Sequence, residues 1–211
     1  GNYALYLGYV DIDNSNTISV LKCTNPNDET NATWTVLGAS NFANAYHSGY
    51  DKDNFVLKIN PVTFEPTIVF HDKNTDPQGK LSVMKYNSGS WSYIGTQGFT
   101  SLSGSGEYLD LTFDPTNGTP YIGLCCDYIY VLKYENSSNS WNYVGPRSPY
   151  GGMNEIQGTY SDFISIAIHP ITREPYIAFQ DFSSGAGQLT VKKFNGNSWI
   201  YVGRKGFSDG I

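Results

Sequence analysis

The chain has 211 residues and a net charge of −6, and charged residues make up only 15% of it. This length gives one large domain or two small ones, with enough chain to bury a core. No cluster of lysine and arginine could follow a phosphate backbone, and no apolar run approaches the roughly 18 residues of a membrane span. The sequence therefore argues against nucleic-acid binding and membrane insertion.

Short strands joined by turns are the predicted elements. Aromatic residues reach 15% with 17 tyrosines, and 22 glycines and 10 prolines punctuate the chain. In chain order, a four-part phrase recurs, and each copy ends near one of the four tryptophans. The first copy spans residues 2–38 and starts directly with the second part, "YLGYVD" at 6–11. It therefore lacks the leading strand that the other three copies have.

The leading part of the later copies is an alternating strand followed by two prolines with four residues between them. A proline cannot donate to a sheet ladder, so the first proline ends the strand. The short segment up to the second proline fits a hairpin turn. The three leading parts have the same length and lie at 55–66, 109–120 and 164–175.

The second part is a nearly continuous apolar run. Such a run is typical of a strand that is covered on both faces. We therefore expect cover on both faces for residues 6–11, 67–72, 121–126 and 176–181.

The third part is a strand with a lysine at the same position in every copy. Four aligned lysines could form a ligand-binding ring. The favoured alternative is an outer strand whose lysine stem lies on its neighbour while the ammonium stays in water. These lysines are Lys22, Lys85, Lys133 and Lys193.

The fourth part is a turn rich in Asn, Gly and Ser, a tryptophan that begins a strand, and a glycine that ends it. Its last copy reads "FNGNSWIYVG" at 194–203. We expect each tryptophan to lie in the stack between neighbouring units. The four are Trp34, Trp91, Trp141 and Trp199.

Units of four short strands with two apolar faces are not stable alone and must stack on copies of themselves. This predicts an all-β fold, a single β-propeller domain over residues 1–211 with about four four-stranded antiparallel blades. Three alternatives stay open: a four-bladed ring with one incomplete blade, a part of a longer propeller, or assembly with a second copy. The blades are expected at 2–38 (partial), 55–95, 109–145 and 164–203.

The end of the last copy carries a further motif. It reads N-G-x-S-W-x-x-V-G at 195–203 and G-F-S at 206–208, and residues 98–100 echo the second element. These residues resemble the extracellular β-propeller repeats of bacterial and protist surface proteins, and the resemblance covers essentially the whole chain. It implies a propeller but no particular chemistry, because propellers carry enzymes, lectins and inert spacers alike.

Function is expected where the copies differ most, in the connectors at 39–54 and 146–162. Aromatic faces beside amide and carboxylate groups suit a sugar, whose apolar face stacks on the ring while the polar groups bind its hydroxyls. The alternative is that the aromatic side chains only hold long loops in place. The candidate ligand-binding residues are Phe42, Tyr46, His47, Tyr50, Tyr150, Asn154, Glu155 and Tyr160.

A cation site is a second candidate, in the hairpin after the second part. Oxygen ligands at alternate positions can bind a hard cation such as Ca²⁺, although the glycine and glutamate of an EF-hand loop are missing. The same residues also favour turns through bonds to their own backbone. The candidate metal ligands are Asp11, Asp13, Asp72, Asn74 and Asp76. No other cofactor is expected.

Catalysis finds little support in the sequence. The three histidines lie in different phrases of different units, and no nucleophile elbow or zinc cluster is present. His169 stands before a proline where the other copies have Asn60 and Asp114, which predicts a turn cap. Carboxylates that converge in a central channel would still allow glycan hydrolysis.

Cysteines and sequons concern the compartment. Cys23, Cys125 and Cys126 fit no metal motif and are expected as small buried side chains. Three glycosylation sequons, with the sparse charge and the many tyrosines, favour a secreted or cell-surface protein. The sequons start at Asn31, Asn117 and Asn136.

Three functions follow as hypotheses. The first is a non-catalytic structural or adhesion module that binds other extracellular proteins or copies of itself. The second is a lectin-like propeller that binds glycans. The third is a glycan-active hydrolase or lyase with its site in the central channel.

Overall fold

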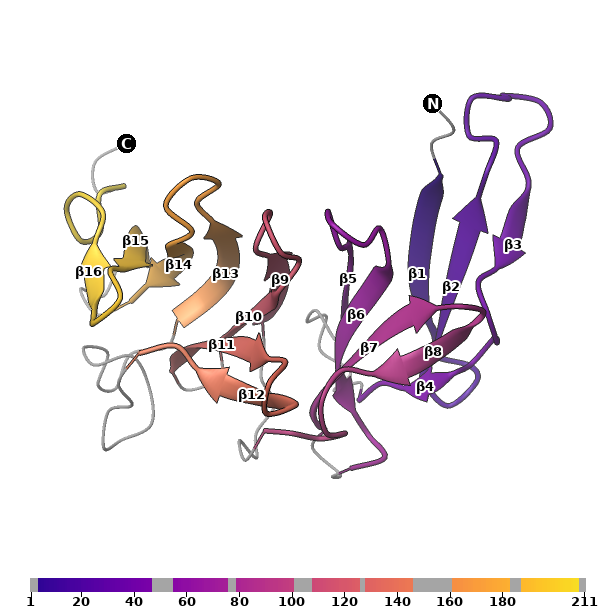
Figure 1. Cartoon of the computed structure of the whole chain (residues 1–211), viewed down its shortest axis with the longest axis horizontal. Coiled ribbons are helices and arrows are strands. Elements are labelled where there is room, and N and C mark those ends of the chain that lie inside the picture. The colour runs from indigo at the N-terminus through magenta and orange to yellow at the C-terminus, as the bar shows by residue number, and fades with distance from the viewer. Residues whose placement is uncertain are drawn as a thin grey trace.

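The computed structural model describes residues 4–46, 55–75, 79–100, 108–125, 128–145, 161–182 and 187–208. Within these ranges the chain forms sixteen strands in four antiparallel sheets, which we name A to D in chain order (Figure 1). No helix of this described part is long and apolar enough to cross a membrane. The sixteen strands and four sheets confirm the all-β prediction.

Sheet A is the unit without a leading strand. Its order is β1-β2-β3, and the short β4 from the following connector also pairs with β2. Among the described residues, β1 therefore has a partner on one edge only. The bounds are β1 (Leu5–Asp11), β2 (Thr17–Cys23), β3 (Trp34–Val36) and β4 (Ala43–Asn44).

Sheets B, C and D each have four strands whose spatial order follows the sequence. Sheet B contains β5 (Phe55–Ile59), β6 (Pro66–Asp72), β7 (Lys80–Asn87) and β8 (Ser90–Tyr93). Sheet C contains β9 (Tyr108–Phe113), β10 (Pro120–Cys125), β11 (Ile129–Glu135) and β12 (Ser140–Tyr143). Sheet D contains β13 (Ser161–Ile168), β14 (Pro175–Asp181), β15 (Gln188–Phe194) and β16 (Trp199–Tyr201).

The four sheets share one register. The aligned lysine of the third part always stands opposite the first residue of the second part, as in Thr67 with Lys85 and Tyr176 with Lys193. These lysines lie on the strand next to the outermost one. They form no ring, because each ammonium has its own neighbour. The pairs are Lys85–Glu65, Lys133–Glu135, Lys193–Glu174 and Lys22 over the Tyr6 ring.

Successive sheets pack face to face, and the core lies in the three layers between them. The A–B layer joins Ile18 to Phe70, the B–C layer joins Val83 to Leu124, and the C–D layer joins Val131 to Phe179. β6 and β10 are buried along their whole length, as expected for strands covered on both faces. Cys23 and Cys125 are buried as well, as the sequence predicts.

In each of these three layers, a tryptophan makes a hydrogen bond to the neighbouring sheet. Its indole Nε1–H donates to the carbonyl that precedes the final glycine of the sheet before it. The bonds are Trp91 to Leu37 at 2.9 Å, Trp141 to Ile94 at 2.8 Å and Trp199 to Val144 at 2.9 Å. The fourth part of the repeat thus joins neighbouring units.

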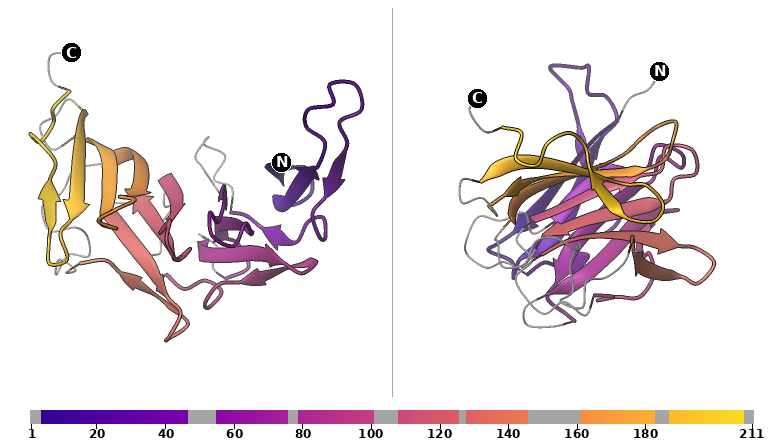
Figure 2. Two further views of the ribbon diagram at one scale, coloured as in Figure 1. Left: turned by 45° about the horizontal axis from the view of Figure 1, so that its top comes forward. Right: turned by 90° about the vertical axis from the view of Figure 1, so that its left-hand side faces the viewer.

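The sheets follow one another along an open arc, with sheet A at one end and sheet D at the other (Figures 1 and 2). Because no further sheet of the described residues covers its outer face, β1 is exposed at alternate residues, with Leu5 and Leu7 both 51% exposed. The expectation of cover on both faces is therefore wrong for β1, and β14 in the other end sheet is fully buried on one face only. Trp34 is 42% exposed and lies outside the stack, which corrects the expectation that every tryptophan is packed between units.

Candidate functional site

The turns between the paired prolines build the site, and one side chain caps each turn. In sheet B, the side-chain oxygen of Asn60 accepts hydrogen bonds from the backbone N–H groups of Val62 and Thr63, at 2.9 and 3.2 Å. In sheet D, His169 Nδ1 accepts from two backbone N–H groups in the same way. The prediction that His169 caps a turn is confirmed.

Asn60 also joins sheet B to sheet C. Its amide Nδ2 donates to the carbonyl oxygen of Gly118 at 2.9 Å, across 58 residues of sequence. A Cβ atom at position 118 would lie 2.7 Å from Asn60 Oδ1, so only glycine permits this approach. The two turns are thereby held together, with the buried Asn60 between them.

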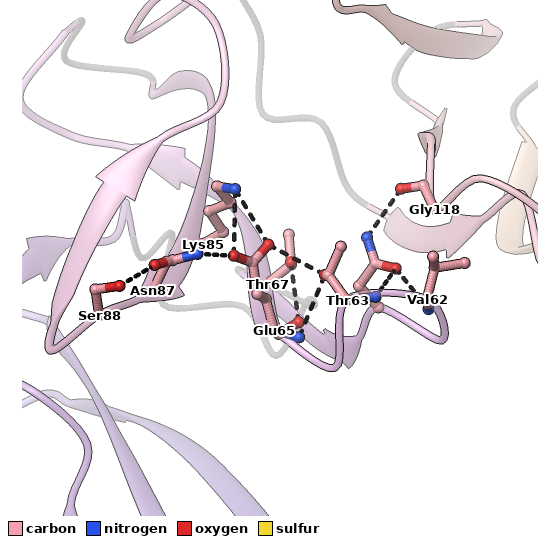
Figure 3. Close-up of polar contacts among 9 residues, drawn as sticks. Val62, Thr63, Glu65, Thr67, Lys85, Asn87, Ser88 and Gly118 are labelled. Carbon is pink, nitrogen blue, oxygen red and sulfur yellow. Dashed lines mark hydrogen bonds and ion pairs between the residues drawn. The ribbon is translucent and has the colours of Figure 1, made fainter.

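Glu65 is the centre of a polar network on sheet B (Figure 3). Its carboxylate accepts from Lys85 Nζ at 3.1 Å, from Thr63 Oγ1 at 3.1 Å and from the Asn87 side chain. Burial raises the pKa of Glu65, but the hydrogen bonds from Asn87, Lys85 and Thr63 outweigh it and leave the pKa below its ordinary value. Glu65 is therefore a fixed negative charge at neutral pH.

A cleft of about 470 Å³ lies between these parts of sheets B and C. Its volume falls in the range of small-molecule sites, about 300 to 1,000 Å³. The lining combines amide, hydroxyl and charged groups with apolar surface. The lining includes Asn60, Thr63, Glu65, Lys85, Phe113, Asn117, Tyr134 and Asn136.

Sheet C supplies the aromatic part of the cleft lining. Tyr134 lies on β11, and its hydroxyl donates to Asn139 Oδ1 at 2.7 Å while its ring contacts the ring of Trp141. Two contacts thus fix the orientation of the ring. Phe113, at the end of β9, is buried. The cleft therefore offers an oriented tyrosine beside polar groups.

The corresponding place between sheets C and D is filled differently. Asp114 occupies the position of Asn60, and Arg173 of sheet D donates to it from Nε at 2.7 Å. Burial raises the pKa of Asp114, but hydrogen bonds from Thr116 and the ion pair with Arg173 outweigh it and lower the pKa. The long side chain of Arg173 thus bridges the C–D junction. At the matching position of the B–C junction, Gly118 has no side chain and leaves room for the cleft.

A second hollow of about 530 Å³ is lined by the innermost strands β5, β9 and β13 together with β1. Of its lining residues, only Asp110 carries a carboxylate. Lys58 Nζ lies 3.5 Å from Asp110, and Ile166 N donates to it at 2.9 Å. A glycan hydrolase needs two carboxyl groups across its substrate, and the described lining of this hollow does not supply that pair.

The connector residues predicted from the sequence are placed only in part. Phe42 stacks on Trp91 with ring centroids 4.4 Å apart, so it packs in the layer between sheets A and B. Tyr46 is half-buried, and its backbone N–H donates to His71 O at 2.7 Å. Six further candidates lie outside the described residues: His47, Tyr50, Tyr150, Asn154, Glu155 and Tyr160. A ligand site in the connectors stays a prediction.

Two of the predicted metal ligands, Asp11 and Asp72, act as turn caps. Asp11 and Asp72 each accept from a backbone N–H at the start of their hairpins, and Asn74 Oδ1 accepts from Asn44. Asp13 is exposed, and Asp76 lies outside the described residues. Among the described residues, no group of three or more His, Cys, Asp or Glu could hold a metal ion. The Ca²⁺ site stays a prediction.

All three predicted glycosylation sites, Asn31, Asn117 and Asn136, are exposed. Glycosylation itself stays a prediction. Two of these residues, Asn117 and Asn136, line the cleft between sheets B and C. A glycan at either position would therefore occupy or cover the cleft.

The sequence did not predict the cleft. Its residues belong to the regular phrases, which were assigned to the scaffold, and they come from turns and strands far apart in the chain. One signal was present: position 118 is glycine where the other two copies have Phe64 and Arg173, so this junction alone combines a small residue with an amide cap.

No protein-family profile and no curated protein matches the chain. A solved structure of a fucose lectin from Kordia zhangzhouensis in complex with methyl-fucoside is similar, with 10% sequence identity and a TM-score of 0.40. The match covers 72% of this chain and 99% of the lectin chain. A likeness at this TM-score says nothing about the function of this chain.

Proposed function

We propose that this protein is a non-catalytic, lectin-like β-propeller module that binds a carbohydrate in the cleft between sheets B and C. The cleft carries the proposal, because it places a fixed carboxylate, amides and hydroxyls beside an oriented tyrosine ring. Sugars need this combination, since they present an apolar face together with a rim of hydroxyl groups.

The propeller form is part of the same proposal. Three features support it: the sheets stack face to face, they share one register, and their leading strands line a common hollow with β1. The resemblance to extracellular propeller repeats and the exposed sequon at Asn31, which lies away from the cleft, support a secreted or cell-surface setting. A propeller would hold successive blades rigidly, and a cleft between two blades would keep its shape before the ligand arrives.

A glycan array followed by calorimetric titration of the best ligand tests the proposal. Tyr134→Ala removes the aromatic surface, and we expect it to weaken binding about tenfold, within the range of aromatic contacts. Tyr134→Phe is the matched control, because it keeps the ring and loses only the hydroxyl bond to Asn139. Asn117→Ala removes an exposed lining amide and should also weaken binding.

Two results would count against carbohydrate binding. The first is an array without hits for protein produced without glycosylation, so that no attached glycan covers the cleft. The second is a bound sugar whose affinity is the same in wild type, Tyr134→Ala and Asn117→Ala. The interaction-module alternative is favoured by a different observation, the exposed apolar faces of sheets A and D, and it does not depend on the cleft.

A further inference from the structure

The three internal junctions share one design, a tryptophan on one sheet and a socket on the sheet before it. In all three, the socket contains the carbonyl that accepts the indole N–H and the glycine that follows it, and in the A–B and B–C junctions it also contains a phenylalanine five residues after the carbonyl. In the A–B junction Phe42 stacks on Trp91, and in the B–C junction Phe99 stacks on Trp141. The described sockets are Leu37–Gly38–Phe42 on sheet A and Ile94–Gly95–Phe99 on sheet B.

Sheet D carries the same socket, in Val202, Gly203 and Phe207. At Gly38 and Gly95, an added Cβ atom would lie 3.3 and 3.1 Å from Cδ1 of the docked tryptophan. At Gly203, no atom of the described chain lies within 4 Å of that position. The socket of sheet D is therefore complete in its residues and holds no tryptophan from the described chain.

Sheet A carries the matching half. Trp34 is 42% exposed, and its Nε1 donates to no acceptor among the described residues. Around it on the same face lie Leu5, Leu7, Tyr9 and Val36, all 40 to 51% exposed. Two of these, Leu7 and Tyr9, occupy the positions that Ile68 and Phe70 fill in sheet B, where both are fully buried.

Exposed apolar side chains also lie around the socket of sheet D, on a face that they share with Gln180 and Lys193. Leu189 is 40% exposed, although the residues at its position in sheets A, B and C are buried. Those residues are Ile18, Leu81 and Ile129, each at most 1% exposed. The outer faces of sheets A and D are thus the two halves of one more junction of the internal kind.

We propose that a second copy of this chain completes this junction, with Trp34 of one copy in the Val202–Gly203–Phe207 socket of the next. The two faces lie at opposite ends of the arc, so a copy that binds through one face still presents the other (Figure 2). Such head-to-tail contacts use different surfaces on the two partners and either close into rings or continue as filaments. The inference is independent of the cleft, which lies between sheets B and C and away from the two end faces.

Mass measurement of the 211-residue chain over a range of concentrations, by ultracentrifugation or light scattering, tests the proposal. We expect a multiple of the chain mass of 23.4 kDa. Trp34→Ala and Val202→Lys should each give a monomer with an unchanged far-ultraviolet circular dichroism spectrum. Both positions are exposed, so either substitution leaves the described layers intact. Ile171→Lys is the control, because Ile171 is 84% exposed in a turn and should leave the mass unchanged.

A mixing experiment separates head-to-tail association from symmetric pairing of like faces. Trp34→Ala keeps its socket and Val202→Lys keeps its tryptophan, so an equal mixture of the two monomers should form a one-to-one dimer. A wild-type chain that is monomeric at every concentration would overturn the proposal. An assembly that survives Trp34→Ala, or a mixture that stays monomeric, would overturn it as well.

Discussion

Trp141 and Trp34 occupy the same position of the repeat, yet their surroundings are opposite. Trp141 is buried between sheets B and C, stacks on Phe99 and donates to Ile94 O. Trp34 is exposed on the outer face of sheet A. The difference shows that the repeat supplies each sheet with both halves of a junction, and that burial depends on whether a neighbouring sheet is present.

The largest expected effect on stability comes from substituting the buried tryptophan, Trp141. Trp141→Ala removes a core aromatic side chain and its hydrogen bond, and should lower the free energy of unfolding by about 3 to 5 kcal/mol. Trp34→Ala in the monomeric state should lower it by less than about 1 kcal/mol, because exposed side chains contribute little. Urea unfolding of both variants measures the contrast, and equal losses would contradict it.

Two glycines, one in an internal junction and one on an exposed end face, allow the same comparison with a smaller effect on stability. Gly95 and Gly203 have nearly the same left-handed backbone, with φ of +80° and +79°, so alanine costs about 1 to 2 kcal/mol of backbone strain at either position. At Gly95 the new methyl group also meets Trp141 Cδ1 at 3.1 Å, and at Gly203 it meets nothing. In the monomeric state, Gly95→Ala should therefore unfold at a lower urea concentration than Gly203→Ala. The reverse order would mean that Gly203 is the more crowded position.

The smallest expected effect is a pH dependence that distinguishes two junctions. Ionised Asp114 binds Arg173 at the C–D junction, whereas neutral Asn60 holds the B–C junction. The folded-state pKa of Asp114 is lowered, so its stabilisation is full above the unfolded value near 3.9 and is lost as the pH falls through the folded value. Because the Arg173 side chain is about half exposed, solvent screens the ion pair, and Asp114→Asn should lose about 1 kcal/mol at neutral pH.

Unfolding experiments in urea at several pH values check this prediction. Between about pH 5 and pH 2 the wild-type chain should lose more stability than the Asp114→Asn variant, because only the wild type protonates this carboxyl group. An Asn60→Asp variant is a useful counterpart at the other junction. It places a carboxylate opposite the Gly118 carbonyl, at a junction where glycine stands in place of the arginine at the matching position of sheet D. Parallel curves for wild type and Asp114→Asn would show that the ion pair adds nothing.

Much of the architecture could be predicted from the sequence because it depends on short-range patterns. Alternating strands, paired prolines and Asn-Gly turns predict four units, and the shared lysine position reflects a register that the sheets do share. The cap at His169 followed from its place before a proline, since neighbours in sequence decide a turn. The missing leading strand of the first unit was also predicted, and β1 has no described partner on that edge.

Only the tertiary structure decided what lies between the units. The cleft depends on Asn60 and Gly118, which meet across 58 residues, and on whether the next turn carries a glycine or an arginine. Patterns within one strand state which face is apolar, but not whether another sheet covers that face. For this reason β1 and Trp34 were expected to be buried and are exposed. Repetition in the sequence determined the shape of each sheet, and the number and order of packed neighbours decided which repeated residues became core and which became surface.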